Sequence, residues 1–427
     1  DVIKTNMMCA AAARPSMVMA VRAVAAQGSG PGAFFRGVGP RALSNGINST
    51  NERPVLLIQH LDGDKSLVTL VADSTASAGN GLAPPRLIDV DANGTMDIAY
   101  AGDLDGRIWK FNLTSTSDAK WGVAVWDQSG SVCRDRADCQ PFARASDPAN
   151  NAVGQPITTA PAWMPHPMGG IQLMVGTGRL LTSSDATSTS VQTVYALWDK
   201  TRYEKGIDAQ GVPGLMSRDT ARIADANLRN RLVSQPVGAA IAVTDSSGKT
   251  HPDLYHQSSS NAVAYSSTID TAPRGWYVDL PVSGERVLVH PHAFLGRKAI
   301  FVTTQPGGGT GDESCDGGTS TGNHWFNVRD MITGAPPTGG VFYAPTVTTS
   351  ITSATRASVP GNEFLLTPAD GNRFTLQMSG SKAFRPTNAM FSAPTGRTPE
   401  RPCCKWRNGW SDRQPHGVVT PLPSPPP

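Results

Sequence analysis

A two-strand unit recurs along this chain of 427 residues. Each unit has a short apolar segment, a turn rich in Gly and Asp, and a second apolar segment that carries an aromatic residue. Such a unit cannot bury both faces of its small sheet alone, but sheets stacked around an axis bury one another. The pattern therefore predicts an all-β fold of the β-propeller class. We count five or six units, at residues 54–71, 98–113, 171–200, 253–280, 299–330 and 364–378.

The composition agrees with a turn-rich β protein. The chain has 43 Gly and 34 Pro, and only 17% of its residues are charged, against about 25% in an average soluble protein. A two-sheet sandwich is the alternative, but it predicts closer and more regular spacing of strands. A closed ring of seven blades would need further blades from upstream sequence. The chain begins at Asp1, without an initiator Met or a secretory signal, so we expect it to be a piece of a longer protein.

The repeated pattern divides the chain into three parts. Residues 1–42 are rich in Ala, Arg, Met and Gly and show no lasting periodicity, so we interpret them as an atypical tail. Residues 43–382 form the predicted propeller. Residues 383–427 are rich in Arg, Pro and Trp, which predicts an extended C-terminal tail.

Charge and hydropathy exclude several classes of partner. A net charge of +3 and a pI of about 8.5 are too mild to indicate nucleic-acid binding. No apolar run is long enough to predict a transmembrane helix.

The pair His290 and His292 has no third ligand at zinc spacing, so we interpret it as ordinary strand surface. No group of residues predicts a catalytic site, and we expect no enzyme activity.

Residues 89–97 have the spacing of a calcium loop. Oxygen-bearing side chains stand at loop positions one, three, five and nine, and Gly94 stands at position six, where the chain must turn sharply. Magnesium fits less well, because it retains several waters and is seldom held in an all-protein cage. The predicted ligands are the side chains of Asp89, Asp91, Asn93 and Asp97 and the carbonyl of Thr95.

The loop differs from an EF-hand. Tyr100 stands at position twelve instead of the bidentate Glu, and Ile, Val and Tyr flank the loop where an EF-hand has helices. We therefore expect a short loop between two strands. The alternative is a hairpin turn without a metal, because Asp, Asn and Gly also favour turns.

Other residues fit structural roles. Cys133 and Cys139 bracket a short polar loop and are predicted to form a disulfide, which would favour an exported protein; two free thiols are the alternative. Glu285 and Arg286 are interpreted as an ion pair in an exposed turn. The aromatic residues at the strand ends are expected in the blade cores and not in a ligand site; they are Trp109, Trp198, Trp276 and Trp325.

With these features in view, the chain resembles the PilY class of type IV pilus tip-associated proteins, and specifically their C-terminal β-propeller. The phrase Gly-Trp-Tyr-Val-Asp-Leu-Pro-Val-Ser-Gly-Glu-Arg-Val at residues 275–287 is the most specific. The other matching phrases lie, in the order of the family, at residues 44–51, 80–85, 89–104, 109–111, 156–161, 175–179 and 196–200.

This resemblance implies a seven-bladed, quinoprotein-like propeller, incomplete here, and a non-enzymatic protein exported to the cell surface, the pilus tip or the outer membrane. It implies roles in pilus assembly, in opposing retraction, in adhesion and in twitching motility. In the family, occupancy of the calcium loop is tied to pilus extension and retraction, and Ca²⁺ is the expected cofactor. The implied partners are minor pilins or pilus tip components, and host or abiotic surfaces through an N-terminal region that this sequence lacks.

Two other functions stay open. Quinoprotein dehydrogenases are also propellers and use calcium beside pyrroloquinoline quinone (PQQ), and Cys403–Cys404 is similar to the adjacent disulfide of some of them. This pair, however, lies in the atypical tail and not on a blade loop. A surface propeller that binds proteins without any connection to pili is the third interpretation.

Overall fold

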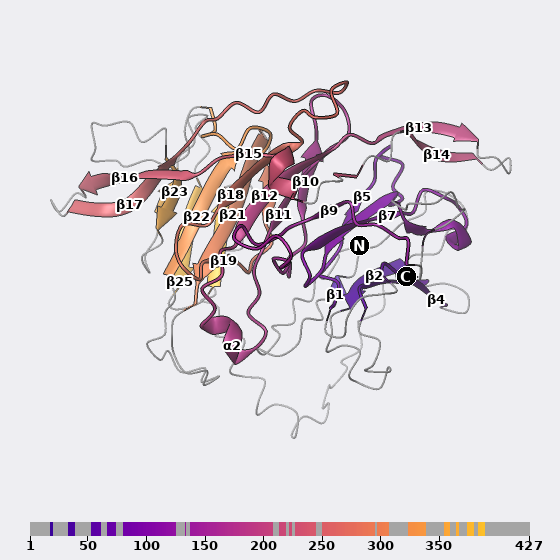
Figure 1. Ribbon diagram of the computed structural model, residues 1–427, viewed down its shortest axis with the longest axis horizontal. Helices are drawn as coiled ribbons and strands as arrows, with labels where there is room; N and C mark the ends of the chain where they lie inside the picture. Colours follow the sequence, from indigo (N-terminus) through magenta and orange to yellow (C-terminus); the bar gives the residue numbers. More distant parts are fainter. Residues whose placement is uncertain are drawn as a thin grey trace, which may run out of the picture.

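The structure is a computed structural model. It describes residues 53–60, 66–73, 80–124, 133, 137–207, 213–218, 222–223, 227–244, 250–294, 297–306, 323–338 and 354–358. For five further strands it gives the backbone alone, at residues 18–19, 33–38, 364–366, 374–379 and 383–388. Strands dominate, and the helices are short (Figure 1).

The first two sheets come from the N-terminal half of the chain. The first has the strand order β1-β2-β3-β4, with bounds Val18–Met19, Ala33–Val38, Val55–His60 and Leu67–Val71. The second has the order β5-β6-β7-β8, with bounds Arg86–Ile88, Ile98–Gly102, Arg107–Asn112 and Gly122–Val123. Strand β9, Ala143–Arg144, also pairs with β7. All of these pairings are antiparallel.

The third and fourth sheets combine strands from distant parts of the chain. The third has the order β10-β11-β12-β18-β15, with bounds Ala162–Pro165, Ile171–Gly176, Thr193–Asp199, Gly275–Asp279 and Val233–Ser234. The fourth has the order β16-β17-β23-β22-β21-β19, with bounds Val237–Thr244, Thr250–Ser258, Ala354–Ser358, Asn323–Asp330, Lys298–Gln305 and Arg286–Val287. Strand β20, His292–Phe294, pairs with β21.

Two smaller sheets and three short helices complete the described elements. Strands β13, Arg202–Ile207, and β14, Pro213–Arg218, form a separate hairpin. Strands β24, β25 and β26 span Phe364–Leu366, Phe374–Ser379 and Ala383–Asn388. The helices are η1, Asp118–Lys120, α2, Ser183–Ala186, and η2, Leu228–Arg231. In the part of the chain that the structure describes, no helix has the length and apolar character needed to cross a membrane.

In strands β6 and β11, alternate residues face opposite neighbouring sheets, which is the packing expected in a propeller. In β6, Ala99 and Ala101 join the core shared with the first sheet, whereas Ile98 and Tyr100 join the core shared with the third. In β11, Leu173 faces the second sheet and Met174 the fourth. Because side chains alternate along a strand, a central sheet buries both faces.

This succession of four face-to-face sheets confirms the predicted all-β propeller architecture (Figure 1). No pairing among the described strands joins the two ends of the succession, so the ring of seven blades stays a prediction. The predicted domain limits, 1–42, 43–382 and 383–427, also stay predictions. Strand β2 lies before residue 43 and pairs with β3, while β26 lies beyond residue 382 and pairs with β25.

Five of the six predicted units are paired strands, and one is wrong. The unit assigned to residues 253–280 instead contributes β17 to the fourth sheet and β18 to the third. The local pattern of apolar segments is the same in both cases. Strand pairing across about 100 residues, such as that of β17 with β23, has no signal in the local sequence.

The structure also decides the smaller structural predictions. Cys133 and Cys139 form the predicted disulfide. The four strand-end Trp side chains are buried in the sheets, as expected. His290 accepts a hydrogen bond at Nδ1 from the backbone N–H of Ala160, at 2.9 Å, and His292 is exposed. Cys403 and Cys404 lie outside the described residues.

The predicted exposed ion pair between Glu285 and Arg286 is wrong. Glu285 is fully buried, and both of its carboxylate oxygens accept hydrogen bonds from Arg356, at 2.5 and 3.0 Å. Arg286 is also buried and donates to backbone carbonyls instead. These carbonyls belong to Arg179, Asp185, Ser188 and Gly284. Glu285 directly precedes β19 and Arg286 begins it, and the two side chains bind different partners.

Candidate metal centre

The predicted calcium loop connects β5 to β6. The two strands pair up to Ile88 and Ile98, which lie opposite each other and are buried. The N–H of Asp97 donates to the carbonyl of Ile88 at 2.9 Å and so closes the loop. The loop therefore begins and ends on buried, paired residues of the second sheet and is a short loop between two strands, as predicted.

The backbone of the loop turns through two left-handed residues. Gly94 has φ of 89°, a conformation that glycine adopts without a steric penalty. Ala92 has φ of 57°, which is uncommon for a residue with a Cβ and costs roughly 1–2 kcal/mol. The Gly at position six therefore has the conformational role that its place in the sequence predicted.

Three carboxylates converge inside this turn. Asp89, Asp91 and Asp97 each offer an oxygen, and these three oxygens all lie within 4.8 Å of one another. Such a spacing allows one cation to contact all three. Asp97 is buried, while Asp89 and Asp91 are partly exposed. The structure thus brings together three of the five predicted ligands.

Backbone N–H groups orient the carboxylates. Asp89 accepts hydrogen bonds from the N–H groups of Asn93, at 3.1 Å, and Gly94, at 2.7 Å. Asp91 accepts from the N–H of Asn93 at 3.2 Å. Asp97 accepts from the N–H of Val90 at 2.7 Å. These bonds fix the carboxylates on one side of the turn, with lone pairs to spare.

Asn93 and Thr95 are directed towards each other. The amide oxygen of Asn93 accepts from the N–H of Thr95 at 2.7 Å and also from its hydroxyl. This arrangement is an Asx turn, which Asn forms readily. Asn93 and Thr95 therefore lie in the same loop as the carboxylates, but the amide oxygen of Asn93 is hydrogen-bonded to Thr95.

The electrostatics of the group are those of crowded anions. Burial raises the pKa of Asp97 to about 6, the hydrogen bond from Val90 opposes this rise, and the charges of Asp91 and Asp89 add to it. Like charges at this separation disfavour the ionised form of Asp97. A nearby cation would relieve this repulsion.

The cation nearest to the carboxylates among the described residues is Lys205 of strand β13. Its Nζ lies 3.7 Å from Oδ2 of Asp91. The lysine side chain is 81% exposed and that of Asp91 is 14% exposed. The two residues are more than 100 positions apart, and no sequence pattern connects them.

A buried ionic cluster near this centre was also missed by sequence reasoning. Lys110 of β7 donates to Asp199 of β12 at 2.7 Å and to the hydroxyl of Thr201 at 2.8 Å. Tyr100 of β6 donates to the same carboxylate oxygen of Asp199. The cluster joins the second sheet to the third. Lys110 and Asp199 both belong to segments on which the resemblance to the PilY class rests, but the sequence does not show that they face each other.

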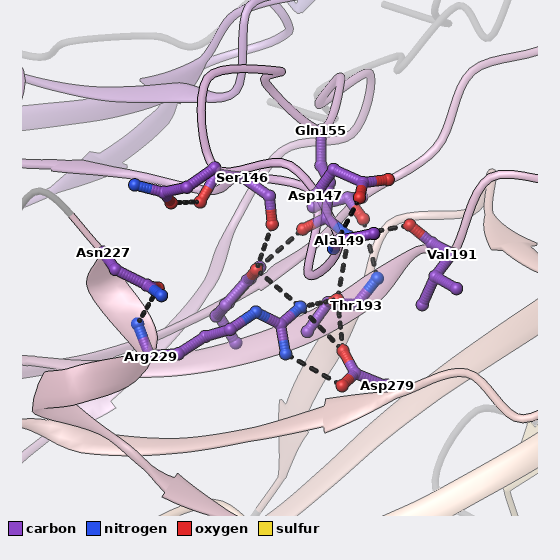
Figure 2. A network of polar contacts seen from close by, with 12 residues as sticks. Ser146, Asp147, Ala149, Gln155, Val191, Thr193, Asn227, Arg229 and Asp279 are labelled. Carbon is purple, nitrogen blue, oxygen red and sulfur yellow. Dashed lines mark hydrogen bonds and ion pairs between the residues drawn. The ribbon is translucent and has the colours of Figure 1, made fainter.

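A second polar network, shown in Figure 2, joins strands of the third sheet to helix η2. Both terminal nitrogens of Arg229 donate to the carboxylate of Asp279, at 2.7 and 2.8 Å. One of them also donates to the hydroxyl of Thr193, at 2.8 Å. The guanidinium lies 4.6 Å from the ring centre of Tyr277. A bidentate pair of this kind fixes geometry, so we interpret the network as structural.

Asp103 is the centre of a third buried network. Its oxygens accept from Nε1 of Trp109 at 2.8 Å, from Nδ2 of Asn80 at 3.1 Å and from the N–H of Arg107 at 2.8 Å. Burial raises the pKa of Asp103 to about 6, although these hydrogen bonds and Arg107 oppose the rise. The sequence identified Asp103 only as a turn residue.

The chain is similar to known proteins over most of its length. The family model of the PilY1 beta-propeller domain matches residues 19–224. The type IV pilus biogenesis factor PilY1 of Pseudomonas aeruginosa PAO1 is 30% identical over 315 residues, which cover 70% of this chain and 24% of that protein. A PilY1 homolog of Xylella fastidiosa is 28% identical over 313 residues, which cover 70% of this chain and 18% of that protein. The chain thus spans about a quarter or less of the length of these relatives.

A solved structure has the same fold. The crystal structure of the Pseudomonas aeruginosa PilY1 C-terminal domain matches with a TM-score of 0.57 and 22% identity. The match covers 87% of this chain and 72% of that one. The family match, the relatives and this fold agree with the packing of successive sheets described above. Residues 19–224 therefore belong to the PilY1 β-propeller family, and most of the chain has the fold of the PilY1 C-terminal domain.

Proposed function

We propose that this chain is the calcium-binding propeller of a type IV pilus tip-associated protein. The observation that carries the proposal is the convergence of Asp89, Asp91 and Asp97, whose oxygens lie within 4.8 Å of one another. Membership of the PilY1 family and the names of the curated relatives, which are type IV pilus biogenesis factors, support the connection to pili.

The residues of the loop fit a calcium ion. Every donor is an oxygen, which is the ligand type that Ca²⁺ prefers, and the turn offers enough oxygens for several of its six to eight ligands. Burial, together with the smaller effect of the charges of Asp91 and Asp89, raises the pKa of Asp97, so a bound cation would favour the ionised form of this carboxylate. We propose that Asp89, Asp91, Asn93, Thr95 and Asp97 hold the ion. When bound, the ion would neutralise these charges and stiffen the loop.

This stiffening has a defined place in the propeller. The loop joins β5 to β6, and the carbonyl of Asp97 accepts a hydrogen bond, at 2.8 Å, from the N–H of Leu113, the residue that follows β7. Three strands of the second sheet therefore meet at the loop. We propose that calcium occupancy sets the order of this end of the sheet and, through it, the affinity for a pilus partner.

The function of the whole protein is inferred from the family. We propose that it is exported, lies at the cell surface, pilus tip or outer membrane, contacts minor pilins or other tip components, supports pilus assembly, opposes retraction, and contributes to adhesion and twitching motility. We propose a binding role and no catalysis. No observation in the described residues favours the quinoprotein dehydrogenase with PQQ.

Isothermal titration with calcium tests the proposal. We expect one site, with a dissociation constant between about 10⁻⁷ and 10⁻³ M, the range of sensor and extracellular loops. The change Asp97→Asn keeps an acceptor for the N–H of Val90 but removes a charge, so it should weaken binding at least about tenfold. Asp147→Asn is the matched control, because Asp147 also accepts backbone N–H bonds in a turn, from Ala149 and Asn150.

Either of two results would refute the site. One is a folded wild-type chain that takes up no calcium. The other is equal affinity in wild type and Asp97→Asn, which would place the ion elsewhere. Circular dichroism of each variant confirms that the chain is folded before the titration is interpreted.

A further inference from the structure

The β13–β14 hairpin is a separate two-stranded sheet that extends away from the body of the propeller (Figure 1). Among the described strands, β13 and β14 pair only with each other. Strand β13 is largely exposed, and its last residue, Ile207, is 69% exposed. A two-stranded hairpin is only marginally stable by itself, so its position depends on its other contacts.

One face of β13 provides these contacts. Tyr203 and Lys205 are two positions apart and therefore point to the same side of the strand. The ring of Tyr203 lies 5.4 Å from the ammonium of Lys110 and packs against the core that also receives Val90 of the calcium loop. Lys205 lies beside Asp91 of that loop, at 3.7 Å. The hairpin thus approaches the calcium loop directly.

The base of the hairpin is fixed independently of the loop. Asp199 and Thr201 come immediately before β13 and are buried, and both bond to Lys110 of the neighbouring sheet. The hairpin therefore has one anchor in a buried ionic cluster and a second, exposed anchor at Lys205. Exposed ion pairs are weak, at about 0–1 kcal/mol. The contact of Lys205 with Asp91 is therefore the one that another cation can replace.

The charge of Lys205 has a simple consequence for a cation at the loop. Its ammonium already serves as a counter-charge to Asp91. A divalent ion held by the same carboxylate would take over that role and would also be repelled by the ammonium. Lysine and calcium are therefore competitors for Asp91.

We propose that Lys205 sets the calcium affinity of the loop, and that ion binding releases Lys205 from Asp91 so that the β13–β14 hairpin reports the occupancy of the site. This inference rests on the proposed calcium function and adds to it a residue outside the loop and an element that responds.

The test combines calcium titration with hydrogen exchange on the folded chain. Lys205→Gln removes the competing charge and should tighten calcium binding about fivefold. This factor corresponds to the interaction energy of two unit charges about 4 Å apart in water-like surroundings. Arg202→Gln is the matched control: it removes a cation from the same strand, but Arg202 donates to the carbonyl of Met168 and not to the loop. We expect its affinity to stay within about twofold of wild type.

Hydrogen exchange measures the second half of the proposal. In wild type, added calcium should increase the exchange of residues 202–207 and 213–218 and leave that of the buried strand β12 unchanged. In Lys205→Gln the hairpin should exchange fast with or without the ion, because its exposed anchor is absent in both states.

The outcomes separate the two proposals. Absence of calcium binding in wild type overturns the proposed function and this inference with it. Calcium binding with equal affinities in wild type, Lys205→Gln and Arg202→Gln overturns the inference alone. Tighter binding in Lys205→Gln without any calcium-dependent exchange in the wild-type hairpin contradicts the reporting role of the hairpin.

Discussion

Replacing Lys110 by Met should destabilise the propeller more than any surface change. Lys110 and Asp199 form a buried ion pair of 2.7 Å that joins the second sheet to the third. Burial alone would raise the pKa of Asp199, but the charge of Lys110 and hydrogen bonds from Lys110, Thr201 and Tyr100 keep this pKa below its usual value. Asp199 therefore carries a negative charge in the folded protein.

The magnitude follows from what Met leaves behind. Met fills much of the volume of the lysine stem, so little packing is lost. The carboxylate of Asp199 keeps its hydrogen bonds from Tyr100 and Thr201 but loses its counter-charge. Removing one partner of a buried pair typically costs about 3–5 kcal/mol, and we expect a loss of this size.

Urea unfolding followed by tryptophan fluorescence measures this loss. The double variant Lys110→Met/Asp199→Asn removes both charges, so we expect it to be more stable than the sum of the two single changes predicts, by at least about 1 kcal/mol. Far-ultraviolet circular dichroism should give the same midpoints, which checks that unfolding is cooperative. A single variant that loses less than about 1 kcal/mol, or strictly additive effects, would refute the reasoning.

Three further predictions concern other buried groups. Burial, with a smaller effect of Arg297, lowers the pKa of His166 to about 4, below its unfolded value of about 6.5. The stability that the neutral imidazole contributes is therefore present above pH 6.5 and is lost as the pH falls towards 4. In urea titrations, His166→Phe should gain stability relative to wild type as the pH is lowered over that interval. Arg356→Met leaves the buried Glu285 without its counter-charge and should cost about 3–5 kcal/mol. Arg297→Met, at a partly exposed pair, should cost about 1 kcal/mol or less in the same assay. Gly106 has φ of 78°, and a Cβ there would lie 2.3 Å from the carbonyl oxygen of Ala145, so Gly106→Ala should lower the melting temperature by several degrees, as seen by calorimetry.

Much of the second sheet could be predicted from the sequence because its signals are local. The apolar segments around Ile98 and Trp109 and the turn between them are close in sequence, and they form the expected pair of strands. The loop at residues 89–97 was also predicted, because the Gly that must turn and the carboxylates that must converge have fixed spacing within nine residues.

The unpredicted ion pairs join residues that are far apart in sequence. Lys205 approaches Asp91, Arg356 binds Glu285, and Lys110 binds Asp199 across sheets. The local sequence around a charged residue reveals neither the partner of that residue nor its burial, because both depend on which parts of the fold become neighbours. The unit expected at residues 253–280 failed for the same reason: its two strands resemble a hairpin locally but belong to different sheets.

The measurement that tests the central claim most directly is a crystal structure of this chain grown with calcium, with anomalous scattering data to locate the ion. The account predicts one ion bound by oxygens of Asp89, Asp91 and Asp97 at about 2.3–2.6 Å, with Lys205 no longer paired with Asp91. A loop without an ion at millimolar calcium, with the three carboxylates still held only by the N–H groups of Val90, Asn93 and Gly94, would contradict it.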